Sequence, residues 1–136
     1  MKRFLTAASA TVAIIAAMSP ATASARSALE GRWRNGKMEI VIGPCGGSAL
    51  CGTVVKASTK QRSRAERGSG TNIIGAKLIT NIRPTGPGSY RGNVYLPDRD
   101  MNAAGTIRQT GPNRLNVRGC VMAILCKSQN WDRISR

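Results

Sequence analysis

Four cysteines are the residues whose type and spacing most directly suggest chemistry in this chain. They form two pairs, Cys45 with Cys51 and Cys120 with Cys126, and each pair encloses five residues. Thiolates can bind zinc, but zinc sites prefer a tighter Cys-x2–4-Cys spacing. The chain begins with an export signal, and an even cysteine count in a short exported protein is typical of disulfides. We therefore expect disulfides and no metal.

The repeated spacing favours pairing within each half of the chain. Residues 46–48 are Gly-Gly-Ser, a turn that brings Cys45 and Cys51 together easily. Residues 121–125 are Val-Met-Ala-Ile-Leu and contain no turn former. Cross-pairing, such as Cys51 with Cys120, is the alternative. We expect the apolar loop 121–125 to be buried at one end of the fold; an exposed tip that meets a partner or a membrane is the other interpretation.

Catalytic patterns are absent from the sequence. The chain has no histidine and no Gly-x-Ser-x-Gly motif, so serine catalysis lacks its usual base and its usual turn. Asp98 and Asp100 begin like a calcium loop, but Ala103 stands where that loop needs glycine, which favours a β-turn. A pair formed by Ser58 and Lys60 would lie on a basic, mobile-looking loop. We predict no catalytic residues, no cofactor and no enzymatic activity.

Residues 1–25 have the features of a secretory signal peptide. Lys2 and Arg3 precede an almost entirely apolar or small run over residues 4–18, and Ala23-Ser24-Ala25 supplies the small residues of a cleavage site. Cleavage after Ala25 leaves residues 26–136, long enough for one domain with a modest core. No later segment is apolar enough to span a bilayer. We expect a periplasmic or secreted bacterial protein.

The charge of the chain is strongly positive. The formal net charge is +15, from 21 Lys and Arg against 6 Asp and Glu; loss of Lys2 and Arg3 with the signal leaves +13. Such a field favours an anionic partner, either a small ligand or a polymer. Aromatic residues are not interleaved with the charges, which argues against nucleic acid. Peripheral contact with a membrane stays open, and we expect a monomer.

Apolar residues alternate with a period of two along most of the mature chain, which predicts strands. Asn35-Gly36 separates the first two runs and predicts a hairpin with a type I′ turn. Short strands separated by turn signals predict an all-β fold, and a closed antiparallel barrel leaves no free edges. The expected strands are 31–34, 37–42, 50–55, 73–82, 90–96, 105–109, 115–121 and 128–134.

Residues 58–70 interrupt this alternation, because they contain no apolar side chain larger than Ala65. We interpret them as a solvated loop or a short exposed helix. The alternative is a flap that meets an anionic ligand. The basic residues proposed for that contact are Lys56, Lys60, Arg62, Arg64 and Arg67.

Several motifs resemble one known family. They are Gly31-x-Trp33, the run from Val41 to Val55 with its Cys-Gly-x-x-x-Leu-Cys-Gly core, Ile74-Gly75, Tyr90-x-Gly92-x-Val94-Tyr95-x-Pro97, Leu115-x-Val117-Arg118-Gly119-Cys120 and Gln129-x-Trp131-x-Arg133. Together they resemble the bacterial domain of unknown function 2147. That resemblance implies a small exported, lipocalin-like (calycin-like) β-barrel with no established activity. The chain differs from the commoner pattern at Tyr90, where Trp is more usual, and at residues 98–101, which replace a Gly-containing turn.

The two tryptophans are expected to close the barrel. In lipocalin-like barrels a similar Trp packs under an Arg from the last strand, so Trp33 could lie under Arg118 or Arg133. We interpret this contact as structural rather than ligand-binding. The expected barrel-closing residues are Gly31, Trp33, Arg118, Trp131 and Arg133.

Because the sequence contains no catalytic pattern, we expect the protein to function by binding. Tyr90 and Tyr95 are candidates to line the mouth opposite the Trp-closed end. We therefore predict a non-catalytic binding module for an anionic or amphiphilic component of the cell envelope. The alternative is a periplasmic protein-interaction, inhibitor or assembly factor that uses residues 58–70 as its contact.

Overall fold

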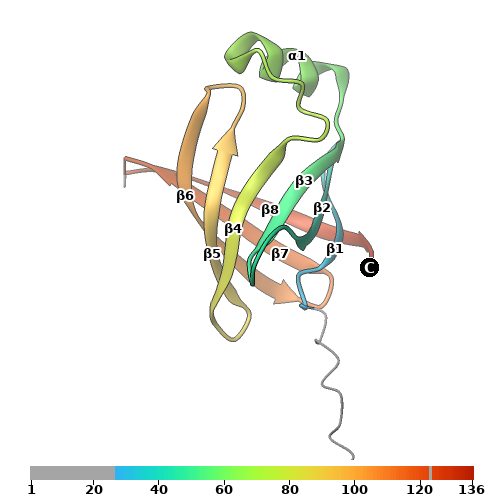
Figure 1. Cartoon of the computed structure of the whole chain (residues 1–136), viewed down its shortest axis with the longest axis vertical. Coiled ribbons are helices and arrows are strands. Elements are labelled where there is room, and N and C mark those ends of the chain that lie inside the picture. The colour runs from blue at the N-terminus through green and yellow to red at the C-terminus, as the bar shows by residue number, and fades with distance from the viewer. Residues whose placement is uncertain (1–26, 123) are drawn as a thin grey trace, which may run out of the picture.

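The chain folds into a closed barrel of eight antiparallel strands with one helix, as a computed structural model shows (Figure 1). The structure describes residues 27–122 and 124–136, so the signal peptide predicted over residues 1–25 lies outside the described residues. Each strand pairs with the next along the chain, which confirms the predicted all-β antiparallel barrel. The elements are β1 (Gly31–Asn35), β2 (Met38–Pro44), β3 (Leu50–Lys56), α1 (Thr59–Ser69), β4 (Lys77–Gly86), β5 (Ser89–Leu96), β6 (Met101–Gly111), β7 (Arg114–Val121) and β8 (Leu125–Ser135).

The first hairpin forms as predicted, but its turn is shifted by one residue. Asn35 pairs with Met38, so the two loop residues are Gly36 and Lys37. Gly36 has a φ of 56°, whereas Asn35 is not among the residues with positive φ. The predicted type I′ turn at Asn35-Gly36 is therefore wrong. Glycine at the first loop position is the pattern of a type II′ turn, which needs positive φ only there.

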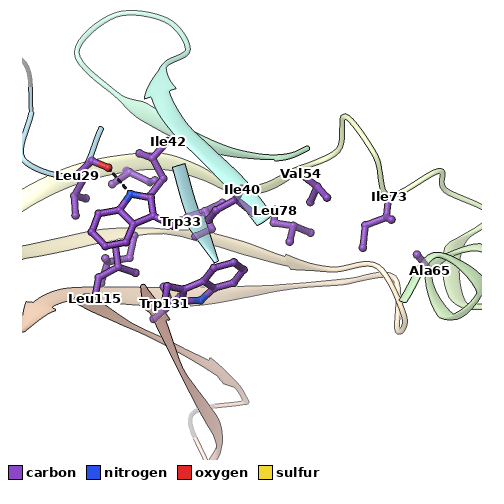
Figure 2. Close-up of a cluster of buried hydrophobic side chains, with 14 residues drawn as sticks. Leu29, Trp33, Ile40, Ile42, Val54, Ala65, Ile73, Leu78, Leu115 and Trp131 are labelled. Carbon is purple, nitrogen blue, oxygen red and sulfur yellow. Dashed lines mark hydrogen bonds between the residues drawn. The ribbon is translucent and has the colours of Figure 1, made fainter. Parts of the chain in front are cut away.

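Aliphatic side chains fill the barrel, and inward-facing glycines make room for them. Gly92, Gly105 and Gly119 are neighbours in register across β5, β6 and β7. A Cβ atom on Gly92 would lie 3.3 Å from Ile79 and Ile82 side-chain atoms, so these isoleucines already occupy that space. A small barrel with few aromatic residues is thus filled by Ile, Leu and Val. Figure 2 shows the resulting core, which extends from Leu29 at one end to Ala65 of α1 at the other.

One end of the barrel is closed by Trp33. Its ring is fully buried, and its Nε1 donates a 2.8 Å hydrogen bond to the carbonyl oxygen of Leu29 (Figure 2). The Arg133 guanidinium lies 4.2 Å from the centroid of the Trp33 ring. Gly31 is required beside this contact, because a Cβ atom there would lie 2.6 Å from the Ser135 carbonyl oxygen and its φ is 142°.

Helix α1 covers part of the opposite end (Figure 1). Ser58 caps its first turn, since the Ser58 hydroxyl accepts from the Gln61 N–H and the Gln61 side chain accepts from the Ser58 N–H. Ala65 is its buried residue, and Gly68 packs against the Asp98 backbone of the β5–β6 turn. Among the described residues, no helix is long and apolar enough to cross a membrane.

Both disulfides join neighbouring cysteines, Cys45 with Cys51 and Cys120 with Cys126. The predicted local pairing is confirmed. The second disulfide cross-links the β7–β8 hairpin at the pair just inside Val121 and Leu125. The burial predicted for loop 121–125 is wrong, because Met122 is 80% exposed, Ile124 84% and Leu125 64%.

β8 is longer than its partner β1, and this difference in length explains the exposure. β1 pairs with β8 only from Arg34–Asp132 to Arg32–Ser135, while β8 pairs with β7 back to Leu125. Lys127 and Gln129 follow the same face of β8 as buried Trp131, yet both are exposed. The β7–β8 hairpin therefore extends past the barrel wall, as its projection to the left in Figure 1 shows.

Candidate functional site

A basic hollow lies on the outer surface, between the β1–β2 turn and the start of α1. Its volume is about 420 Å³ and it is open to solvent. Lys37 and Lys56 line it and are exposed, and in the described part of the chain neither forms an ion pair. Two ammonium groups on one concave surface can bind an anion such as a phosphate or a carboxylate. The lining residues are Arg34, Gly36, Lys37, Glu39, Lys56, Ala57 and Ser58.

Glu39, the carboxylate of this hollow, is neutralised by two arginines. It lies directly opposite Arg34 in the β1–β2 register and is buried. The Arg34 Nη2 atom is 2.8 Å from Glu39 Oε1, and the Arg32 Nη2 atom is 2.6 Å from Glu39 Oε2. The hydrogen bond from Arg34, followed by that from Arg32 and the charges of both arginines, lowers the pKa of Glu39 although burial raises it. The carboxylate therefore stays ionised and the hollow keeps a positive balance.

The basic residues predicted in segment 58–70 lie on α1. Lys60, Arg62, Arg64 and Arg67 are all exposed, so the segment is the short exposed helix of the first interpretation. Arg62 lines a second, smaller hollow of about 270 Å³ with Glu66 and residues 70–72. The Ser58 hydroxyl serves as the helix cap, which leaves it poorly placed for a Ser–Lys pair. Lys56 lines the first hollow, whereas none of the four cations of α1 does.

The two tyrosines predicted at one mouth lie at opposite ends of β5. Tyr90 pairs with Pro84 beside the β4–β5 turn and packs against the core. Tyr95 lies near the β5–β6 turn, where its hydroxyl group is 2.8 Å from Asp100 Oδ1. The prediction that they line one mouth together is wrong. Five residues at about 3.3 Å each separate them by about 17 Å along β5, so they cannot lie at the same end of the barrel.

Of the two arginines proposed to stack on Trp33, the structure brings Arg133 to it. Arg133 also donates hydrogen bonds to the carbonyl oxygens of Ala28, Glu30 and Pro112. Burial, with a smaller contribution from the charge of Arg136, lowers the pKa of Arg133. Arg118 is exposed on β7, opposite Ser128. The Trp33–Arg133 contact is thus a structural closure of the barrel, whereas Arg118 takes no part in it.

Trp131 is also buried inside the barrel, opposite Leu115. Its Nε1 has no hydrogen-bond acceptor among the described residues. An unsatisfied buried donor costs about 1–3 kcal/mol. Trp131 therefore contributes to the core through its apolar ring.

Sequence reasoning missed Arg34, Lys37 and Glu39 as part of this site. The signal was present, because a hairpin centred near Gly36 places Arg34 opposite Glu39. Glu39 pairs with Arg32 and Arg34, so Lys37 in the turn has no ion-pair partner among the described residues. The hollow itself depends on where α1 begins, which strand alternation does not define.

A sequence profile of one bacterial family matches residues 31–133. The family is described as an uncharacterized protein conserved in bacteria, DUF2147. This chain belongs to that family. The match runs from Gly31 at the start of β1 to Arg133 in β8, so it includes β1 to β7 of the DUF2147 barrel and most of β8. No curated protein matches the chain.

Among solved structures, the DUF2147 barrel is similar to protein HP1028 from Helicobacter pylori, which is described as belonging to the lipocalin family. The TM-score is 0.59 at 12% sequence identity, and the similarity covers 79% of this chain and 83% of that one. At this identity the likeness concerns the fold alone. It confirms the lipocalin-like architecture that the family resemblance implies.

Proposed function

We propose that this protein is a non-catalytic, exported binding module for an anionic or amphiphilic component of the bacterial cell envelope. The observation that carries the proposal is the basic hollow, where Lys37 and Lys56 form no ion pair with another described residue, together with the exposed cations of α1. The lipocalin-like fold is consistent with a binding protein. Two disulfides are compatible with an oxidising compartment outside the cytoplasm.

The ligand binds outside the barrel in this proposal. Isoleucine side chains fill the interior beside the inward-facing glycines, and Trp33 with Arg133 closes one end. Two hollows beside α1, one lined by Lys37 and Lys56 and the other by Arg62, are open to solvent. Binding on a surface selects charge rather than shape, so we expect affinity to depend strongly on salt.

A binding screen with matched charge variants tests the proposal. The probes are phosphatidylglycerol vesicles, an acidic glycan and DNA, each at moderate salt. The variant Lys37→Gln/Lys56→Gln removes two cations from the hollow, and Arg91→Gln/Arg108→Gln removes two exposed cations from β5 and β6. Each cation near an anionic surface contributes about 1 kcal/mol. We expect the hollow variant to weaken binding roughly thirtyfold, and the control by less.

Two results would sink the proposal. One is that no probe is retained above moderate salt. The other is an equal loss of affinity in both double variants, because binding would then depend on the net charge of the protein and not on the basic hollow. Retention of one stoichiometric protein partner, lost on deletion of residues 58–70, would favour an interaction or inhibitor role instead.

A further inference from the structure

The end of the β7–β8 hairpin carries the most exposed large apolar side chains of the described residues. Met122, Ile124 and Leu125 are 80%, 84% and 64% exposed. The other exposed large hydrophobic residues, such as Val41 and Ile134, reach only 38–39%. We call Met122, Ile124 and Leu125 the apolar tip. Scattered apolar residues on a surface are ordinary, but three together at a projecting end indicate an interaction site.

The geometry of the hairpin keeps the apolar tip away from the barrel. β8 between Leu125 and Gln129 is paired with β7 alone, so this half of the hairpin projects beyond the wall (Figure 1). The Cys120–Cys126 disulfide cross-links the two strands immediately behind the tip. A cross-linked hairpin loses little conformational entropy when its end is bound, so the tip is preorganised for contact.

Cations follow the apolar tip on both faces of the hairpin. Lys127 pairs with Gly119 on one face, and Arg118 pairs with Ser128 on the other. At about 3.3 Å per residue, Lys127 lies about 7 Å behind Leu125, and Arg118 about 13 Å behind Met122. Both side chains are exposed and long enough to reach toward the tip. Residues 118–130 contain no Asp or Glu.

We propose that the apolar tip inserts into the interface of a phospholipid bilayer that contains anionic lipid, with Arg118 and Lys127 at the level of the head groups. Apolar side chains followed by cations match the order of acyl chains and phosphates that a protein meets at a bilayer surface. The net charge of +13 that remains after loss of Lys2 and Arg3 adds attraction to the same surface. A convex apolar end also fits a fluid interface, which needs no preformed groove. The inference rests on the proposed function, because it names anionic lipid as the amphiphile.

Vesicle co-sedimentation with matched variants tests the apolar tip. The probes are vesicles of phosphatidylglycerol mixed with phosphatidylcholine, and vesicles of phosphatidylcholine alone. The tip variant is Ile124→Ser/Leu125→Ser. The control is Val41→Ser/Ile134→Ser, which changes two exposed aliphatic residues outside the tip. We expect the wild type to bind the mixed vesicles, the tip variant to bind at least about tenfold more weakly, and the control to change less than about twofold.

A fluorescent probe at the same place separates insertion from adhesion. Leu125→Trp adds one exposed indole to a chain whose Trp33 and Trp131 are buried. We expect its emission to shift to the blue on the mixed vesicles, while the wild-type emission stays constant. Bound protein with unshifted emission would overturn insertion.

The outcomes also separate this inference from the proposed function. If the tip variant binds like the wild type while Lys37→Gln/Lys56→Gln fails to bind, the tip proposal is wrong and the basic hollow is responsible. If the protein binds an acidic glycan but no vesicle, the tip proposal is again wrong and the proposed function stands. If sedimentation shows a dimer that the tip variant abolishes, the tip contacts a second copy and the lipid proposal is overturned.

Discussion

Replacing Arg133 with alanine should remove the closure at one end of the barrel. The wild-type guanidinium stacks on Trp33 at 4.2 Å, and such a partly desolvated contact contributes about 1–2 kcal/mol. Arg133 also donates to three backbone carbonyl oxygens, and a hydrogen bond from a charged donor contributes about 1.5 kcal/mol or more. Arg133 is only half-buried, so water can replace roughly half of that hydrogen bonding. We expect the free energy of unfolding to fall by about 3 kcal/mol.

Urea denaturation of the oxidised protein, followed by tryptophan fluorescence, measures this loss. Arg114→Ala is the matched control, because Arg114 pairs with Asp132 at side-chain exposures of 62% and 63%. An exposed ion pair of this kind contributes at most about 1 kcal/mol. Arg133→Lys should lie between the two, since it keeps the charge and loses the planar stacking. The account of the closed end is refuted if Arg133→Ala costs no more than Arg114→Ala.

Three further predictions concern the core and the pH dependence of stability. Trp33→Phe should cost at least about 1 kcal/mol more than Trp131→Phe in urea denaturation, because Trp33 Nε1 donates to Leu29 whereas Trp131 Nε1 has no acceptor among the residues that the structure describes; equal losses would contradict this. Gly92→Ala places a Cβ atom 2.9 Å from the Thr80 carbonyl oxygen and should lower the free energy of unfolding by about 1–3 kcal/mol, while Gly111→Ala, with open space around it, should be nearly neutral. The pKa of Glu39 is lowered from 4.5 in the folded protein, so its contribution to stability is present above pH 4.5 and lost as the pH falls through the folded pKa. Glu39→Gln should therefore flatten the acid side of a stability–pH curve, and an unchanged curve would show that the two arginines do not hold the carboxylate.

The sequence predicted the barrel and its closure because these depend on local patterns. Alternating apolar residues define which face of each strand is inside, and the register then follows from the turns. The pairing of Trp33 with an arginine of the last strand was predicted from the family resemblance, and Arg133 proved to be the residue. Local disulfide pairing was likewise predicted from the repeated spacing and is confirmed.

The exposure of Met122, Ile124 and Leu125 could not be predicted in the same way. It depends on the difference between β1, with five residues, and β8, with eleven. Strand ends are determined by where a partner strand stops, which is information from another part of the chain. The bounds of the predicted strand 73–82 are wrong for the same reason. β4 begins at Lys77, and Ile73, which precedes it, is buried near α1. The basic hollow also required the position of α1 relative to the β1–β2 turn.

Native mass spectrometry on protein purified from envelope fractions tests most directly whether binding takes place outside a filled barrel. The account predicts the mature chain with two disulfides, and any co-purified molecule to be an anionic lipid or polymer that dissociates at high salt. The Lys37→Gln/Lys56→Gln variant should carry less of it than the Arg91→Gln/Arg108→Gln control. A stoichiometric apolar molecule that survives high salt and is retained by both variants would place the ligand inside the barrel and contradict the account.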